Sequence, residues 1–96
     1  MYQIAWTPIA QESHQQIFDF VLENWSIDIA IKFDNDVQEL LQSLENHEHL
    51  CPPLNKIKGV RKCVISKQAS LLYRVHTQSK VIELLFFFDN RTKHPY

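Results

Sequence analysis

The spacing of apolar residues changes once along the chain, and this change limits the folds that the chain can adopt. Up to about residue 46 apolar side chains recur every three or four positions, which is the period of an amphipathic helix. Beyond Gly59 they recur at every second position, which is typical of strands with one buried face. A helical half followed by a stranded half predicts an α+β fold.

Local signals place the elements of the first half. Residues 2–6 predict a short strand, because this segment is β-branched and aromatic and stops at a Thr-Pro pair. Thr7 suits an N-cap and Pro8 suits the first position of a helix over about 8–24. Ser26 is a second N-cap, so a second helix follows after a very short link. Two helices joined in this way predict an antiparallel hairpin.

The second half is predicted to be a connector followed by three strands. The connector spans 47–59, where Pro52-Pro53 blocks a helix and Gly59, the single glycine, suits a turn with positive φ. The expected strands are 60–65, 70–76 and 81–88. Loops of hairpin length separate them. The predicted order is therefore β-α-α-β-β-β.

Strand parity predicts which side chains face the helices. One face carries Leu71, Tyr73 and Val75, followed on the next strand by Ile82, Leu84, Phe86 and Phe88. This face is expected to pack on the helices, because alternate residues of a strand share a face. The other face carries Leu72, Leu85 and Phe87 beside charged residues. An exposed apolar patch beside charge usually marks a partner surface, so we expect a partner groove there.

The two halves of the chain carry opposite charges. Residues 1–50 contain nine acids and one base, a net charge of −8, whereas residues 51–96 contain nine bases and two acids, a net charge of +7. A basic region suits an acidic protein or a nucleic acid. The alternative is that the two regions pair with each other or face water.

Composition favours one cytoplasmic domain that does not enter a membrane. The chain has 96 residues, no apolar run long enough to span a bilayer and no signal-peptide pattern at its start. Cys51 and Cys63 form neither a CxxC pair nor a disulfide framework, so two reduced thiols are expected. His47 and His49 lie close to Cys51 but lack a second pair of ligands. No metal or cofactor is expected.

Three polar residues have two interpretations each. Arg61 follows the glycine turn and could grip a phosphate or an acidic target, or pair with a helix carboxylate. Arg74 is expected to form a cross-strand pair with Glu83. His14 lies in the apolar stripe of the first helix, where a core histidine with a local hydrogen bond is more common than a catalytic base.

Several segments together resemble one protein family. They are Ile4-Ala5-Trp6-Thr7, Val60-Arg61-Lys62-Cys63-Val64, Leu72-Tyr73-Arg74-Val75 and Leu85-Phe86-Phe87-Phe88-Asp89-Asn90-Arg91. Through these segments, which are spread over nearly the whole chain, the sequence resembles the RelE/ParE toxin superfamily, and its ParE-type branch in particular. The resemblance implies an antiparallel sheet packed on an N-terminal helical hairpin. It also implies a cognate antitoxin protein, which would bind as a helix and an added strand.

The resemblance implies two possible activities. ParE-type toxins act on DNA gyrase without being enzymes, and RelE-type toxins cut mRNA on the ribosome. For a gyrase inhibitor the expected target-binding residues are Arg61, Lys62, Arg74, Arg91 and Lys93. The expected antitoxin-binding residues are Leu72, Leu85 and Phe87. For a ribonuclease the catalytic candidates are Lys56, Lys58, Arg61, Arg91, His94 and Tyr96. The gyrase-directed activity is preferred, because RNA-cleaving members are generally more basic overall.

Overall fold

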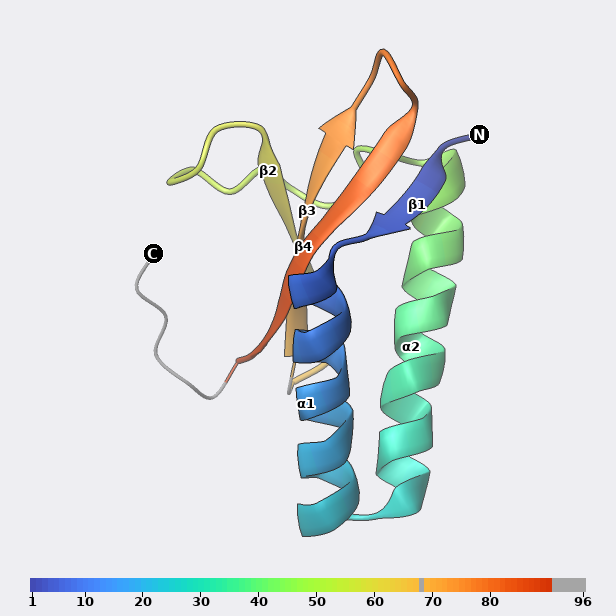
Figure 1. Cartoon of the computed structure of the whole chain (residues 1–96), viewed down its shortest axis with the longest axis vertical. Coiled ribbons are helices and arrows are strands. Elements are labelled where there is room, and N and C mark those ends of the chain that lie inside the picture. The colour runs from blue at the N-terminus through green and yellow to red at the C-terminus, as the bar shows by residue number, and fades with distance from the viewer. Residues whose placement is uncertain (68, 91–96) are drawn as a thin grey trace.

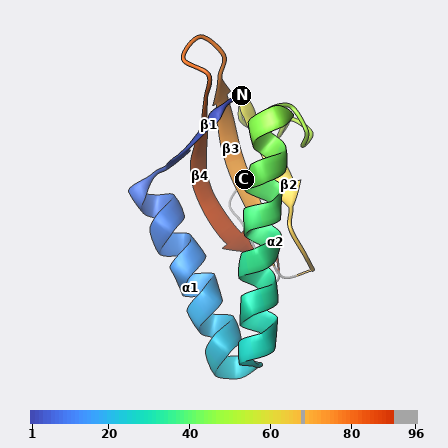
Figure 2. The same cartoon turned by 90° about the vertical axis from the view of Figure 1, so that its right-hand side faces the viewer.

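The computed structural model describes residues 1–67 and 69–90 (Figure 1). Its elements are β1 (Gln3–Trp6), α1 (Pro8–Asn24), α2 (Ile27–Asn46), β2 (Val60–Val64), β3 (Ala69–His76) and β4 (Val81–Asp89). This order confirms the predicted β-α-α-β-β-β arrangement. The two helices lie side by side over one face of the sheet (Figure 2). The other face of the sheet, turned away from the helices, is called the outer face below.

Both predicted helix caps are present. The Thr7 Oγ1 accepts a hydrogen bond from the Ala10 N–H at 3.0 Å, and the Ser26 Oγ accepts one from the Ile29 N–H at 3.2 Å. The Thr7 hydroxyl also donates to the Leu84 carbonyl of β4 at 2.7 Å. One side chain therefore starts α1 and fastens that start to the sheet.

The sheet has the strand order β1-β4-β3-β2. As predicted, β2 pairs with β3 and β3 with β4 in antiparallel fashion. Strand β1 pairs with β4 in parallel, with Gln3 opposite Val81 and Trp6 opposite Leu84, so the sheet is mixed. A parallel neighbour requires a long crossover connection, and the helical hairpin begins that connection.

A bulge in β4 reverses its parity. Leu72 pairs with Phe86 and Tyr73 with Leu84, so Leu85 is an extra residue without an opposite partner on β3. Beyond the bulge, Phe87 points to the helices, whereas Phe86 and Phe88 belong to the cluster on the outer face. The predicted orientation of these three phenylalanines is therefore wrong, since strict alternation assumes that no residue is inserted.

An aromatic cluster joins the helices to the sheet. The Phe87 ring lies 5.5 Å from the Trp6 ring and 5.4 Å from the His14 ring, and His14 stacks on Phe33 of α2 at 5.4 Å. The packing of His14 among core side chains agrees with the prediction, but the predicted local hydrogen bond of its Nε2 is absent from the described residues. Its Nε2 lies 3.2 Å from the Asp34 Oδ1, but within the described residues it has no partner in hydrogen-bond geometry. This contact is therefore an ion pair only when the imidazole is protonated.

A second, smaller cluster lies on the outer face. Val60, Leu72 and Phe88 are its buried members. Leu54 of the connector, Leu85 and Phe86 pack against them. The connector therefore covers part of the outer face with an apolar side chain.

Cys51 and Cys63 form a disulfide bond, with their Cα atoms 5.2 Å apart. The prediction of two reduced thiols is wrong. The connector folds back along β2, where the Lys62 N–H donates to the Pro52 carbonyl at 3.0 Å and Pro53 forms a bridge with Arg61. This return places the two cysteines together. Spacing in the sequence does not reveal it.

No helix within the described ranges is both long enough and apolar enough to cross a membrane.

The reversed orientation of Phe86 and Phe87 predicts how much stability each ring contributes. Phe87→Ala should lower the free energy of unfolding by about 3–5 kcal/mol, because this ring is buried against Trp6 of β1 and His14 of α1. Phe86→Ala, the same change one residue away on the partly exposed side, should cost about 1 kcal/mol. Urea unfolding of the two variants would test this. Equal losses would contradict the reversed parity.

Candidate functional site

The outer face brings two predicted target-binding cations together. Lys62 lies opposite Leu72 and Arg74 lies opposite Val60, so both cations share the face that carries the second apolar cluster. The Lys62 Nζ lies 5.5 Å from the centroid of the Phe88 ring. A lysine at this distance is attracted by the electron-rich face of the ring. Lys62 and Arg74 are called the basic pair below.

Arg74 is held between a strand neighbour and a turn. It lies opposite Glu83 in the register, but the Glu83 Oε1 pairs with the His76 Nε2 at 2.9 Å. Among the described residues Arg74 forms no ion pair with Glu83, so the predicted cross-strand pair is not formed. A Cβ atom added to Gly59 would lie 3.9 Å from the Arg74 Nε. Gly59 has a φ of 80°, which confirms the predicted positive φ. The glycine turn therefore lies directly beside this guanidinium.

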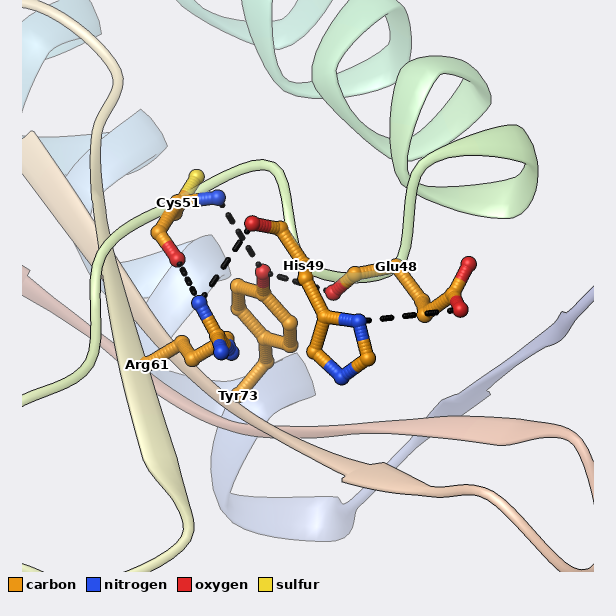
Figure 3. A network of polar contacts seen from close by, with 5 residues as sticks. All are labelled: Glu48, His49, Cys51, Arg61 and Tyr73. Atoms are coloured by element: carbon orange, nitrogen blue, oxygen red, sulfur yellow. Dashed lines mark hydrogen bonds and ion pairs between the residues drawn. The ribbon is translucent and has the colours of Figure 1, made fainter.

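Arg61 has a different environment from the basic pair. Its Nη1 donates to the Cys51 carbonyl at 2.6 Å and to the His49 carbonyl at 3.3 Å (Figure 3). Both acceptors are backbone atoms of the connector. Neither interpretation of Arg61 from the sequence, contact with a target or pairing with a helix carboxylate, predicted these contacts. Through these two hydrogen bonds the Arg61 side chain helps to hold the connector in place.

Tyr73 completes this network from the neighbouring strand. It lies opposite Arg61 in the register and is fully buried. Its hydroxyl donates to the Glu48 carbonyl at 2.9 Å and accepts from the Cys51 N–H at 3.3 Å. Burial raises the pKa of the phenol above 10.0, although the Cys51 hydrogen bond and the nearby Arg61 charge act in the opposite direction. Sequence reasoning assigned Tyr73 to the core and missed its polar role.

The ribonuclease candidates that lie within the described residues have different environments. Lys56 and Lys58 are exposed in the connector, whereas Arg61 is directed at the connector backbone. The remaining ribonuclease candidates, Arg91, His94 and Tyr96, lie outside the described residues, as does Lys93, which was predicted to bind the target.

The predicted antitoxin groove is not formed as expected. Leu72 is fully buried in the outer cluster, and Phe87 is 3 % exposed and packed against the helices. Placing these two side chains on an open apolar surface was therefore wrong. Leu85, the bulge residue, is half-buried on the outer face.

Several large apolar side chains are exposed instead on the helical hairpin. The distal ends of α1 and α2 extend beyond the sheet (Figures 1 and 2). Exposed apolar side chains there are Phe20, Leu22, Trp25, Ile27, Ile29 and Ile31. This set is called the hairpin patch. A cavity of about 390 Å³, lined by Val21, Ile29, Phe33 and the loop residues Ser66 and Lys67 among others, adjoins it.

The sequence contains a signal for the hairpin patch. Both helices carry more apolar residues than a single buried stripe requires, for example Ile27, Ile29 and Ile31 at alternate positions. Such residues cannot all face the sheet in a helix. The patch also lies beside Asp19, Glu23 and Asp28, within the acidic half of the chain.

Comparison with known families identifies the chain. The model of the family described as the ParE toxin of the type II toxin–antitoxin system parDE matches residues 4–93. The chain belongs to the ParE toxin family. It is thus a toxin of the type II toxin–antitoxin class, and the sequence resemblance is confirmed.

Solved structures share the fold. A chain of the chromosomal ParDE toxin–antitoxin system from P. aeruginosa has a TM-score of 0.75 at 22% identity, covering 93% of this chain and 96% of that one. A copper-bound mutant toxin from Helicobacter pylori has a TM-score of 0.65 at 21% identity, covering 93% and 94%. A conserved hypothetical protein from Helicobacter pylori has a TM-score of 0.57 at 17% identity, covering 91% and 92%. Comparison with curated proteins gives no significant match.

The tyrosine network predicts both a stability loss and a pH effect. Tyr73→Phe should cost about 1–3 kcal/mol at neutral pH, because it leaves the buried Cys51 N–H without its acceptor. Since the folded-state pKa of Tyr73 is raised, its contribution is complete below a pH of about 10 and is lost as the pH rises through the folded value. Chemical unfolding between neutral and alkaline pH should show a shallower decline for the variant. An unchanged decline would contradict this assignment.

Proposed function

We propose that this toxin inhibits DNA gyrase in the bacterial cytoplasm by binding it, and that a cognate antitoxin neutralises the toxin. The observation that carries the proposal is the match of residues 4–93 to the ParE toxin family. Membership by itself does not identify the target. The arrangement of charged and apolar surfaces supports the two binding roles separately.

The outer face is the proposed target surface. The basic pair lies on neighbouring strands, and Lys62 packs over Phe88, which leaves a cationic surface on an apolar base. Cations of this kind steer an acidic partner and fix its orientation. Arg74 also offers a planar group that can bind a carboxylate through two hydrogen bonds. Binding alone can inhibit an enzyme, so no catalytic group is required of the toxin.

The hairpin patch is the proposed antitoxin surface. It presents exposed apolar side chains on helices that are otherwise acidic. An amphipathic antitoxin helix with basic flanking residues would bury the apolar side chains and pair with the acidic ones. Because the hairpin patch and the basic pair belong to different elements, separate variants can test the two roles.

Charge reversal on the outer face should reduce toxicity. Lys62→Glu together with Arg74→Glu should weaken target binding at least about tenfold, since placing like charges together costs several kcal/mol. Growth after controlled expression and gyrase supercoiling by the purified chain would measure this. Lys80→Glu, a single charge reversal in the β3–β4 turn, should leave both readouts unchanged.

The same expression experiment separates the two activities of the superfamily. A gyrase inhibitor should alter DNA supercoiling while transcripts stay intact. Codon-spaced mRNA cuts with normal supercoiling would overturn the proposal in favour of a ribosome-dependent ribonuclease.

The hairpin patch should control neutralisation. Ile27→Asp or Ile31→Asp should weaken binding of the antitoxin encoded beside the toxin by about tenfold, because each removes a large exposed apolar contact. Toxicity in the absence of antitoxin should be retained. Ile9→Asp is a matched control, since Ile9 is 64 % exposed at the other end of α1. Equal losses at all three positions would argue against this docking surface.

A further inference from the structure

Three of the contacts that fasten the connector between α2 and β2 to the sheet are made by one residue, Cys51. Its N–H donates to the Tyr73 hydroxyl at 3.3 Å, its carbonyl accepts from the Arg61 Nη1 at 2.6 Å, and its sulfur is bonded to Cys63. Figure 3 shows Tyr73 and Arg61 converging on this residue. Cys51 is therefore held by one covalent and two non-covalent attachments.

The non-covalent attachments do not depend on the sulfur atoms. Arg61 and Cys63 lie two residues apart on β2 and share a face, while Tyr73 is opposite Arg61 on β3. Both hydrogen bonds involve backbone atoms of Cys51, so they can persist when the S–S bond is broken. They would keep Cys51 close to Cys63 in the reduced chain. Cleavage and re-formation of the disulfide therefore do not require the chain to unfold.

We propose that Cys51–Cys63 is a reversible redox site that sets how firmly the connector is held against the sheet. In a reducing compartment, disulfides that do form are usually transient or redox-sensing. Only this physiological setting rests on the proposed cytoplasmic location. The chemistry of the site does not depend on the target of the toxin.

The reductant for this site is a dithiol. One thiolate of the dithiol attacks the sulfur of Cys51, because Cys51 is the more exposed residue (8 % compared with 2 % for Cys63), and Cys63 leaves as a thiolate. The second thiol of the dithiol then attacks the mixed disulfide and releases Cys51. The dithiol is oxidised to a disulfide, and the two electrons and two protons that it loses convert the cystine to two cysteine thiols. A small-molecule disulfide reverses the reaction.

Loosening the connector would affect the outer face. The connector carries the exposed Lys56 and Lys58, and its Leu54 packs on the apolar cluster beside the basic pair. Backbone hydrogen bonds join it to β2, among them those from the Lys62 N–H to the Pro52 carbonyl and from the Leu54 N–H to the Val60 carbonyl. Amide exchange at Leu54 and Lys62 therefore reports directly on how firmly the connector is held.

The test compares oxidised and dithiothreitol-reduced forms of the purified full chain by hydrogen exchange. For a loop of this size, the chain-entropy model predicts that breaking the disulfide increases local opening of the connector by at most about 100-fold. Because the Arg61 and Tyr73 contacts persist, we expect Leu54 and Lys62 to exchange about tenfold faster after reduction. The amides of α2 are an internal control and should be unchanged. The Cys51→Ser/Cys63→Ser variant should exchange like the reduced form, with or without dithiothreitol.

A second measurement tests the positioning residues. After reduction, oxidised glutathione should restore the disulfide in the folded chain, read as the loss of two alkylatable thiols. Tyr73→Phe should slow this step about threefold to tenfold, because it removes one hydrogen bond that holds Cys51 in place. Thr77→Val, which removes a hydroxyl group in the exposed β3–β4 turn, should close at the wild-type rate.

Two results would overturn the proposal. Two thiols that stay alkylatable in the folded chain after glutathione oxidation would show that the bond does not form reversibly. Equal exchange at Leu54 and Lys62 in both redox forms would show that the bond does not control the connector. Neither result depends on gyrase inhibition or on growth, so failure here is distinct from failure of the proposed function.

Discussion

The packing of Phe87 against Trp6 and His14 is the contact on which the other features of this fold depend. It joins β4 to β1 and α1 directly, and the stacking of His14 on Phe33 extends it to α2. The contact exists because one extra residue in β4 turns Phe87 inward. That residue also turns Phe86 and Phe88 outward, where they form the apolar base of the outer face. A single insertion thus supplies aromatic side chains to both faces of the sheet.

The periodicity of the sequence was sufficient to predict the elements and their order. Thr7 and Ser26 marked the helix starts correctly, because capping is decided by residues close in sequence. The faces of β4 could not be predicted, since a bulge depends on pairing with a distant strand. The disulfide was missed for the same reason: the connector must first fold back along β2 before Cys51 and Cys63 meet.

The candidate site was predicted in part. Lys62 and Arg74 share the outer face. They lie on β2 and β3, and the alternation of side chains along these two strands is not changed by the extra residue in β4. Arg61 could not be assigned from the sequence, since its acceptors are backbone carbonyls, which carry no residue-specific signal. The hairpin patch was overlooked because only the stripe of each helix that repeats every three or four residues was considered. The sheet is shorter than the hairpin, and only the fold shows which residues it leaves uncovered (Figure 2).

The parallel pairing of β1 with β4 has a consequence for how the toxin is made. Gln3 lies opposite Val81, so β1 can pair only after β4 has been synthesised. The hairpin, in contrast, depends on contacts between neighbouring segments and can form early. During synthesis the chain should therefore present its helices, with their apolar patch, before the sheet closes. A protein that recognises the hairpin could bind the nascent toxin before its outer face exists.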